Sequence, residues 1–255
     1  MTTLASSEPR TTARFLLDAA EHGEADAQAL LGQILLDGQG IARDEALAFA
    51  WFGIAARQGH AMALNMLGRC HEHGWGCASD LQAATRRYRQ AAERGLDWGM
   101  YNLANLLATG RGAPQDHAQA FAWYLQAAEL GHAKSMNLVG RYLAEGVLGA
   151  PQPQAALDWF RRSAEGGDFR GQFSYALRML DQGQPEQARH WLQRALEGGN
   201  LNFLRASRGR LLEKPGLEDL ALAYHRRAAE LGDESDREAC LTFESADDLA
   251  RGGMG

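Results

Sequence analysis

Reactive side chains are concentrated in one stretch, residues 70–77, whose sequence is CHEHGWGC. Its two thiols and two imidazoles are zinc ligands by type, but structural zinc sites draw on CxxC or HxxxH pairs, and this run has neither. Cys70 and His71 also fall at repeat positions that are apolar in other parts of the chain. We therefore predict that both side chains point into a core and that no residue binds a metal. The alternatives are a metal-binding or redox role for the run, or a disulfide between Cys70 and Cys77.

No other group of residues is typical of catalysis. Several Gly-x-Gly runs look like phosphate-binding loops, but none continues to a third glycine or to Gly-Lys-Ser/Thr, and none is expected to follow a strand. Gly-x-Ser-x-Gly, HExxH and CxxC do not occur. We therefore expect a protein without enzymatic activity, without catalytic residues and without a cofactor.

The glycines are spaced regularly and define the elements that carry these side chains. Glycine makes up 29 of 255 residues, more than the roughly 7% of an average protein. Two series recur every 36 residues: Gly23, Gly59, Gly95, Gly131 and Gly167, and between them Gly38, Gly74, Gly110 and Gly146. A repeat of this length indicates a solenoid, in which each unit buries its apolar face against its neighbours.

Each unit is predicted to form two helices, called here helix A and helix B. Helix A has apolar residues at three-to-four spacing and ends at the middle glycine, whose access to positive φ suits a C-terminal cap. Asp44, Asp80 and Asp116 are placed to cap the start of helix B. With a half unit at the start of the chain, we expect about thirteen helices and no sheet.

Helix B carries two columns that predict how the units pack. Eleven positions before each closing glycine lies an alanine, and eight positions before it lies a ring in five of the six units. We predict that the small residue allows close approach of helices and that the ring fills the space between units. The rings of this column are Trp51, Trp123, Trp159, Trp191 and Tyr224.

The combined pattern resembles the Sel-1-like repeat, a relative of the tetratricopeptide repeat. The first unit carries the motif as Leu31-Gly32, Gly38-Gln39-Gly40, Asp44, Trp51-Phe52 and Ala55-Ala56-Arg57-Gln58-Gly59. The fourth unit departs from it, because Leu148 replaces the second loop glycine and two prolines displace the acidic cap. The fifth and sixth units are shorter than the others.

This resemblance implies an all-α fold, a right-handed α/α superhelical solenoid of about six helix pairs plus an N-terminal half unit. We expect residues 1–10 to form an N-terminal arm, residues 11–233 the solenoid, and residues 234–255 an acidic C-terminal tail or cap. The tail is expected to be a solvated cap; alternatively, Leu241 and Phe243 cover the open end of the last unit.

Composition and charge exclude several function classes. Apolar residues make up 45% and charged residues 23% of the chain, as in folded proteins. The net charge is −6, whereas nucleic-acid-binding proteins usually carry an excess of Lys and Arg that contacts phosphates. We therefore expect no nucleic-acid partner. No apolar stretch has the length of a membrane helix and the opening residues do not resemble a signal peptide, so we expect a cytoplasmic protein without a membrane partner. The preference for Arg over Lys points to a bacterial source.

A partner-binding groove can be predicted from the repeat register. In the family that the repeat resembles, helix A faces the concave side, and positions three, six and ten after each closing glycine share one helical face. From the second unit onward these positions hold mostly amides, cations and aromatic rings, together with Met62 and Leu177, but no acid. We predict that a protein partner or an extended peptide, acidic or C-terminal, binds there through Asn65, Arg69, Trp98, Tyr101, Asn105, Lys134, Asn137, Arg141, Arg170, Phe173, Asn202 and Arg205.

The resemblance and the groove together predict a non-enzymatic scaffold or adaptor. Two alternatives use the same residues differently. One is an accessory or regulatory subunit of an enzyme complex, in which the partner carries the catalysis. The other is a metal-responsive or redox-responsive adaptor that uses the run from Cys70 to Cys77. A further alternative is that the groove residues are only solvated lining.

Overall fold

The computed structural model describes the backbone of residues 8–252 and the side chains of residues 14–245. Within this range the chain forms fourteen helices and no strand, which confirms the all-α prediction. In chain order they are α1 (Glu8–Glu21), α2 (Ala25–Asp37), α3 (Glu45–Arg57), α4 (Ala61–His73), α5 (Leu81–Ala92), α6 (Asp97–Thr109), α7 (His117–Glu129), α8 (Ala133–Glu145), α9 (Pro153–Glu165), α10 (Phe169–Asp181), α11 (Pro185–Gly198), α12 (Leu201–Leu212), α13 (Glu218–Leu231) and α14 (Glu234–Gly252).

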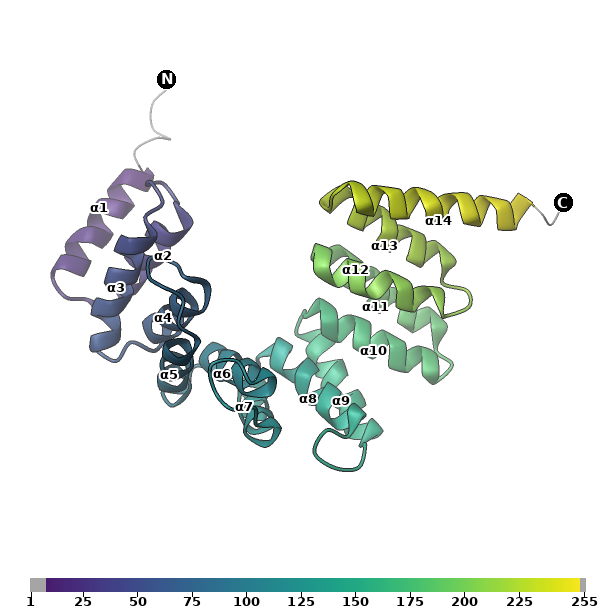
Figure 1. The fold of residues 1–255 in the computed structure, drawn as a ribbon, viewed down its shortest axis with the longest axis horizontal. Helices are drawn as coiled ribbons and strands as arrows, with labels where there is room; N and C mark the ends of the chain where they lie inside the picture. Colours follow the sequence, from purple (N-terminus) through teal and green to yellow (C-terminus); the bar gives the residue numbers. More distant parts are fainter. Residues whose placement is uncertain (1–7, 253–255) are drawn as a thin grey trace, which may run out of the picture. The chain divides into compact units, whose positions relative to one another are not determined.

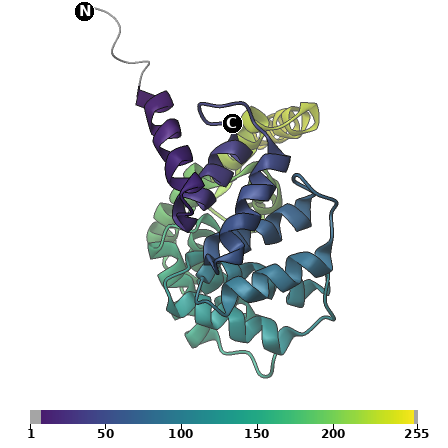
Figure 2. The same ribbon diagram turned by 90° about the vertical axis from the view of Figure 1, so that its left-hand side faces the viewer.

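Most helices that follow one another within one half of the chain pack against each other, such as α2 on α3, α4 on α5 and α8 on α9, as expected for an α/α solenoid (Figures 1 and 2). The even-numbered helices from α2 to α12 correspond to helix A, and the odd-numbered helices from α3 to α13 correspond to helix B. The chain divides into two compact units, the first ending at His132 and the second beginning at Ala133.

The helix ends of the first unit follow the predicted signals. Gly38 and Gly74 end α2 and α4 in the left-handed conformation, with φ of 70° and 76°. Asp44 and Asp80 are the N-caps of α3 and α5; the Asp44 carboxylate accepts a hydrogen bond from one backbone N–H group of the first turn, and the Asp80 carboxylate accepts hydrogen bonds from two. Asp116 caps α7 in the same way. The predicted boundaries between helix A and helix B are therefore confirmed in this unit.

Two glycines of the repeat motif are required by close contacts. Gly68 on α4 faces the ring of Tyr88 on α5, and a Cβ atom there would lie 2.5 Å from two ring carbons. Gly112, in the loop after α6, has φ of 72° and packs on the backbone carbonyl of Leu81 in the preceding repeat, where a Cβ atom would overlap it. The first contact joins the two helices of one repeat, and the second joins successive repeats.

The buried face of helix B differs from the prediction. The alanine column is buried, as predicted, but the tryptophans eight positions before the closing glycines are only half-buried. The next residue along the chain is the fully buried one in most repeats, as shown by Phe52, Tyr88, Tyr124 and Phe160. These rings lie four residues after the alanine and the tryptophans lie three residues after it; at 3.6 residues per turn, the fourth residue is rotated less away from the buried alanine than the third. The expected ring position holds in the last repeat, where Tyr224 is buried and donates a hydrogen bond to the Leu192 carbonyl.

The second unit ends in a helix that the repeat pattern does not include. The acidic segment after residue 233 forms α14, which packs on α13 and accounts for the fourteenth helix. Phe243 stacks on His225 of α13 with the ring centroids 4.8 Å apart, whereas Leu241 is 63% exposed. The buried carboxylate of Asp236 pairs with Arg205 and Arg208 of α12. Phe243 therefore covers the end of the repeats, and Leu241 does not.

Candidate functional site

All twelve predicted groove residues lie on the helices that correspond to helix A. The first unit contributes Asn65 and Arg69 from α4, with Trp98, Tyr101 and Asn105 from α6. The second unit contributes Lys134, Asn137 and Arg141 from α8, Arg170 and Phe173 from α10, and Asn202 and Arg205 from α12. Their side chains have different surroundings in the two units.

In the first unit, α6 presents an aromatic cluster. Trp98 is 40% exposed and packs edge-on against His132, with the ring centroids 4.6 Å apart. Tyr101 lies beside both, with centroids 6.0 Å from Trp98 and 4.9 Å from His132. His132 was not among the predicted residues because it directly follows a closing glycine, outside the three positions considered. The cluster is a rigid apolar surface with one large exposed ring.

Two amides of the first unit are used within the fold. Asn65 is buried, and its Oδ1 accepts a hydrogen bond of 2.9 Å from Asn102 Nδ2, which joins α4 to α6. Asn105 Oδ1 accepts a hydrogen bond of 2.7 Å from the Tyr124 hydroxyl, which joins α6 to α7. Both amides therefore hold helices together. Among the predicted residues of this unit, the aromatic rings and Arg69 remain as the groups that can contact a partner.

Arg69 lies beside a small hollow between α2 and α4. Its guanidinium carbon is 5.0 Å from the centroid of the Trp75 ring. Both residues line a cavity of about 250 Å³ together with Gln33, Leu36, Asp37 and Arg43. The structure thus brings Arg69 together with a ring from the glycine loop, not with the aromatic cluster of α6.

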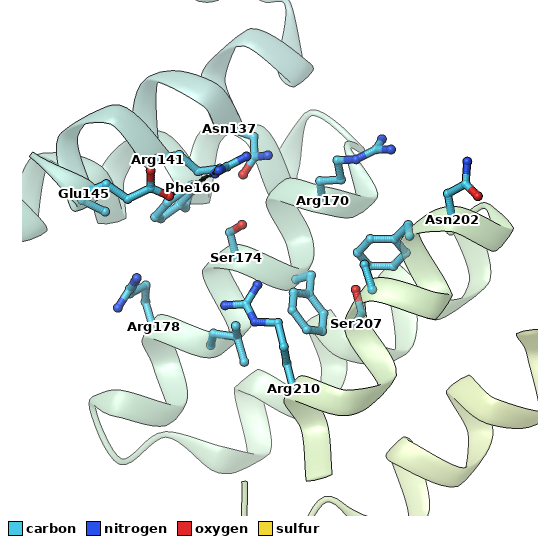
Figure 3. A pocket seen from close by; sticks show the side chains of 15 residues that line it. Asn137, Arg141, Glu145, Phe160, Arg170, Ser174, Arg178, Asn202, Ser207 and Arg210 are labelled. Atoms are coloured by element: carbon cyan, nitrogen blue, oxygen red, sulfur yellow. Dashed lines mark hydrogen bonds and ion pairs between the residues drawn. The ribbon is translucent and has the colours of Figure 1, made fainter. Parts of the chain in front are cut away.

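In the second unit, five predicted residues line one pocket of about 640 Å³ between α8, α10 and α12. Figure 3 shows polar side chains from the three helices around one hollow, with Arg210 reaching toward its centre beside Ser174 and Arg170 directed toward its edge on the side of Asn202. We call it the arginine pocket; its predicted lining residues are Asn137, Arg141, Arg170, Phe173 and Asn202.

The arginine pocket also has lining residues that the sequence reasoning missed, including Arg178 and Arg210. Both lie eleven positions after a closing glycine, one step beyond the last position considered. Ser174 lies seven positions after a closing glycine, one turn before Arg178 on the same face of α10. The repeat register could therefore have predicted these three lining residues, if positions seven and eleven after each closing glycine had been included with positions three, six and ten.

Positive charge dominates the arginine pocket. It contains four arginines and one carboxylate, that of Glu145. Arg141 pairs with Glu145 at 3.3 Å, and Arg178 pairs with Asp181 at 3.2 Å. The pocket therefore favours an anionic ligand.

The pocket also has an apolar floor, formed by Phe160, Phe173, Leu177 and Phe203. The ring of Phe173 is almost completely buried, and the Arg210 guanidinium lies over it, 5.3 Å from its centroid. Phe173 was predicted as a contact residue, but the structure places it in the hydrophobic core, where it supports Arg210. Apolar side chains and cations thus share one surface.

Two predicted residues of the second unit lie outside the arginine pocket. Arg205 on α12 donates hydrogen bonds to Asp236 and Asp233. These carboxylates raise the pKa of the Arg205 guanidinium, chiefly through the hydrogen bond to Asp236. Lys134 lies in the first turn of α8. The structure therefore assigns Arg205 to the attachment of α14 on the last repeat.

The run from Cys70 to Cys77 is part of the repeat packing. Cys70 is completely buried, as predicted, and burial raises the pKa of its thiol to about 12. Cys77 Sγ lies 3.6 Å from His71 Nδ1, while His73 packs against Trp75. Within the described part of the chain, no group of three or more His, Cys, Asp or Glu residues is arranged to hold a metal ion. The three cysteines form no disulfide.

Across residues 8–252, no helix is both long enough and apolar enough to cross a bilayer.

Comparison with known families identifies the repeat. The model of the Sel1 repeat matches the chain six times, at residues 25–60, 61–96, 99–132, 133–168, 170–200 and 213–233. Each of the first four matches covers one helix A and the helix B that follows it, except that the third match omits the first two residues of α6. The search of the curated proteins found no match for this chain.

Solved structures with the same repeat are similar to this chain. One is c5321, a protective antigen present in uropathogenic Escherichia coli strains and displaying an SLR fold, with 29% sequence identity and a TM-score of 0.71. That match covers 94% of this chain and 52% of the other, so this chain spans about half the length of that protein. A Sel1 repeat protein from Oxalobacter formigenes has 24% identity and a TM-score of 0.73, and the match covers 91% of this chain and 95% of the other.

A third similar structure is that of an immunity protein. The immunity protein Pa5087 from Pseudomonas aeruginosa has 17% identity and a TM-score of 0.53, and the match covers 86% of this chain and 80% of that one. At this identity the likeness shows the fold alone.

Proposed function

Because this chain belongs to the Sel1 repeat family, whose members generally mediate protein–protein interactions and are typically non-catalytic, we propose that it is a non-enzymatic adaptor that binds a protein partner on its helix A surface. The aromatic cluster of α6 is the observation that carries this proposal. Trp98 exposes a large ring that its neighbours Tyr101 and His132 hold in place. Rigid, partly exposed aromatic rings are typical anchors of protein interfaces.

The surroundings of Trp98 support this role. The ring packs against His132 and Tyr101, so little side-chain entropy remains to be lost when a partner covers it. Met62 on α4 is also 41% exposed and lies at the same repeat position as Trp98. Flexible methionine and rigid tryptophan at equivalent positions offer apolar contact area on successive helices.

The proposal is tested by affinity capture followed by measurement with the identified partner. The tagged protein is incubated with a lysate of its source organism, and proteins retained by the wild type are identified and purified. Their affinity is then measured by isothermal titration calorimetry for the wild type, Trp98→Ala and the control Leu130→Ala. Leu130 is a second exposed apolar residue of the first unit, outside helix A.

We expect Trp98→Ala to weaken binding by roughly 30-fold, which corresponds to about 2 kcal/mol for an interface hot spot. Leu130→Ala should leave the affinity unchanged. Circular dichroism of both variants checks that they remain helical. Equal affinities for the wild type and Trp98→Ala would place the interface away from the α6 cluster and contradict the proposal.

A further inference from the structure

We infer that the arginine pocket is the site that holds an acidic, extended segment of the partner, with Arg170 and Arg210 binding its side-chain carboxylates. This inference rests on the proposed function. It adds to the aromatic cluster of α6 a second contact with the same partner and names the chemistry of that contact. The pocket lies entirely within the second unit, whereas the aromatic cluster lies within the first. The two contacts can therefore be tested by separate variants.

Arg170 and Arg210 differ from the other two arginines of the pocket. Arg141 and Arg178 each pair with a carboxylate of their own helix. For Arg170 and Arg210 no ion pair is found among the described side chains; instead, each guanidinium lies over a phenylalanine ring, that of Phe169 or Phe173. A guanidinium above a ring keeps its N–H groups at the edge of its plane, where a carboxylate can accept two of them.

The acid nearest to Arg170 in sequence does not neutralise it by direct pairing. Asp168 is the buried N-cap of α10, and its Oδ2 accepts a hydrogen bond of 2.8 Å from the Gly171 N–H. Its carboxylate is therefore used to start the helix. The pocket keeps an excess of positive charge although the whole chain has a net charge of −6.

Asn137 is an independent sign that a ligand belongs in the pocket. Its side chain is only 3% exposed, and its Oδ1 has no hydrogen-bond partner among the described residues. Figure 3 shows this amide at the pocket, near Arg141. A buried carbonyl without a partner costs free energy, and an N–H group of a bound peptide would satisfy it.

The repeat register explains why this amide has no partner. Asn65 occupies the same position in the first unit, and Asn102, seven positions after the closing glycine of the next repeat, donates to it. The residue equivalent to Asn102 opposite Asn137 is Ser174, whose side chain is shorter and which also lines the pocket. In the first unit this amide pair joins α4 to α6. At the equivalent helices of the second unit, α8 and α10, the Oδ1 atom of Asn137 is left without a donor from the described residues.

The size of the pocket and its apolar floor favour a peptide over a small anion. A volume of about 640 Å³ exceeds the space that one carboxylate needs and is in the range of pockets that enclose a drug-sized ligand. The phenylalanine floor can accept an apolar side chain next to the acidic ones. Because two of the four arginines of the pocket have no ion pair among the described side chains, a segment with more than one acidic side chain fits it best.

The test uses a phage-displayed library of random dodecapeptides, selected on the full-length protein and counter-selected on Arg170→Gln, Arg210→Gln. We expect the recovered peptides to be enriched in Asp and Glu relative to the unselected library. Each is then synthesised with an amidated C-terminus, and its affinity is measured by fluorescence anisotropy. A second version carries Asn and Gln in place of Asp and Glu, and a third has a free C-terminal carboxylate.

The matched control is Arg161→Gln, Arg227→Gln, which removes two exposed arginines from helices α9 and α13 of the same unit. We expect Arg170→Gln, Arg210→Gln to weaken binding of the acidic amidated peptides at least tenfold, and the control to change it less than twofold. The neutral peptides should bind at least tenfold more weakly than the acidic ones.

Several results would overturn the inference. These are failure to select any peptide, selection of peptides without acidic enrichment, an equal loss of affinity in both double variants, or binding that requires the free C-terminal carboxylate. Peptides or partners whose binding depends on Trp98 but not on Arg170 and Arg210 would leave the proposed function standing and refute this site. Acidic peptides whose binding needs Arg170 and Arg210, together with a partner whose affinity is unchanged in Trp98→Ala, would support this site and contradict the proposed function.

Discussion

Gly68 shows how one residue type decides the packing within a repeat. The ring of Tyr88 lies directly over it, in the space where any side chain would begin. The same arrangement recurs in the first and fourth repeats, where Gly32 faces Phe52 and Gly140 faces Phe160. The glycine of the Leu-Gly motif is therefore needed because helix B places its buried ring against helix A. The hydroxyl of Tyr88 also donates a hydrogen bond of 2.8 Å to Glu72, which fixes the ring.

Gly68→Ala is predicted to destabilise the protein by roughly 1–3 kcal/mol, the usual cost of overpacking a core. Gly209→Ala is the matched control, because Gly209 lies within α12 and a Cβ atom there would meet nothing within 4 Å. That change should stabilise by up to about 1 kcal/mol through helix propensity. Urea denaturation followed by circular dichroism measures both, and a shift of the same sign in the two variants would contradict the packing argument.

At the scale of the element, α14 is joined to the last repeat by a ring stack, a charge cluster and an ion pair between Arg226 of α13 and Glu244. The stack of Phe243 on His225 buries both ring nitrogens of the histidine, and neither has a hydrogen-bond partner within the described part of the chain. Asp236 supplies the charge cluster, with Arg205 and Arg208. An acidic sequence alone predicts a solvated tail; the arginines of α12 and the exposed end of α13 make it a packed helix.

The stability of this interface should depend on pH through His225. Burial, with a smaller contribution from the charge of Arg208, lowers the pKa of His225 below its ordinary value of 6.5. The folded state therefore binds fewer protons than the unfolded state, so the stability is full above about pH 6.5 and falls as the pH drops below it. We expect the urea midpoint of the wild type to fall between pH 7.5 and pH 5.

His225→Phe should reduce this pH dependence, because phenylalanine retains the stack on Phe243 and does not titrate. No hydrogen bond to the imidazole is lost, so the variant should be at least as stable as the wild type at pH 5. Limited proteolysis at both pH values reports on α14 itself. A wild type and a variant with parallel pH profiles would show that His225 does not control this interface.

At the scale of the whole molecule, the chain combines a negative net charge with a local excess of cations. The net charge is −6, yet one pocket of the second unit contains four arginines and a single carboxylate. Association with an acidic segment is governed by this local field, since charges farther away than a Debye length are screened. The aromatic cluster of the first unit relies on apolar contact and is less sensitive to salt.

Raising the salt concentration from 50 to 300 mM should therefore weaken binding of the acidic peptides several-fold, because the Debye length falls from about 14 to about 6 Å. The contribution of Trp98 to binding of the whole partner, measured as the ratio of wild-type and Trp98→Ala affinities, should change little over the same range. Fluorescence anisotropy and calorimetry measure the two quantities. Peptide affinity that is independent of salt would contradict a contact based on carboxylates and arginines.

The sequence by itself determined the repeat, the helix boundaries of the first unit and the family, because these depend on local signals. A capping aspartate such as Asp80 and a left-handed glycine such as Gly74 act within a few residues of their own position. The placement of predicted binding residues on helix A follows from the same register. Such features can be found without knowledge of what packs against them.

Tertiary structure alone decided which side chains remain available for binding. Asn65 and Asn137 hold the same repeat position, yet one is satisfied by Asn102 and the other faces Ser174 and has an open acceptor. Arg205 was predicted to contact a partner, but α14 occupies its guanidinium. These outcomes depend on residues contributed by neighbouring helices at a distance of about one repeat. The spacing within a single unit therefore cannot specify them.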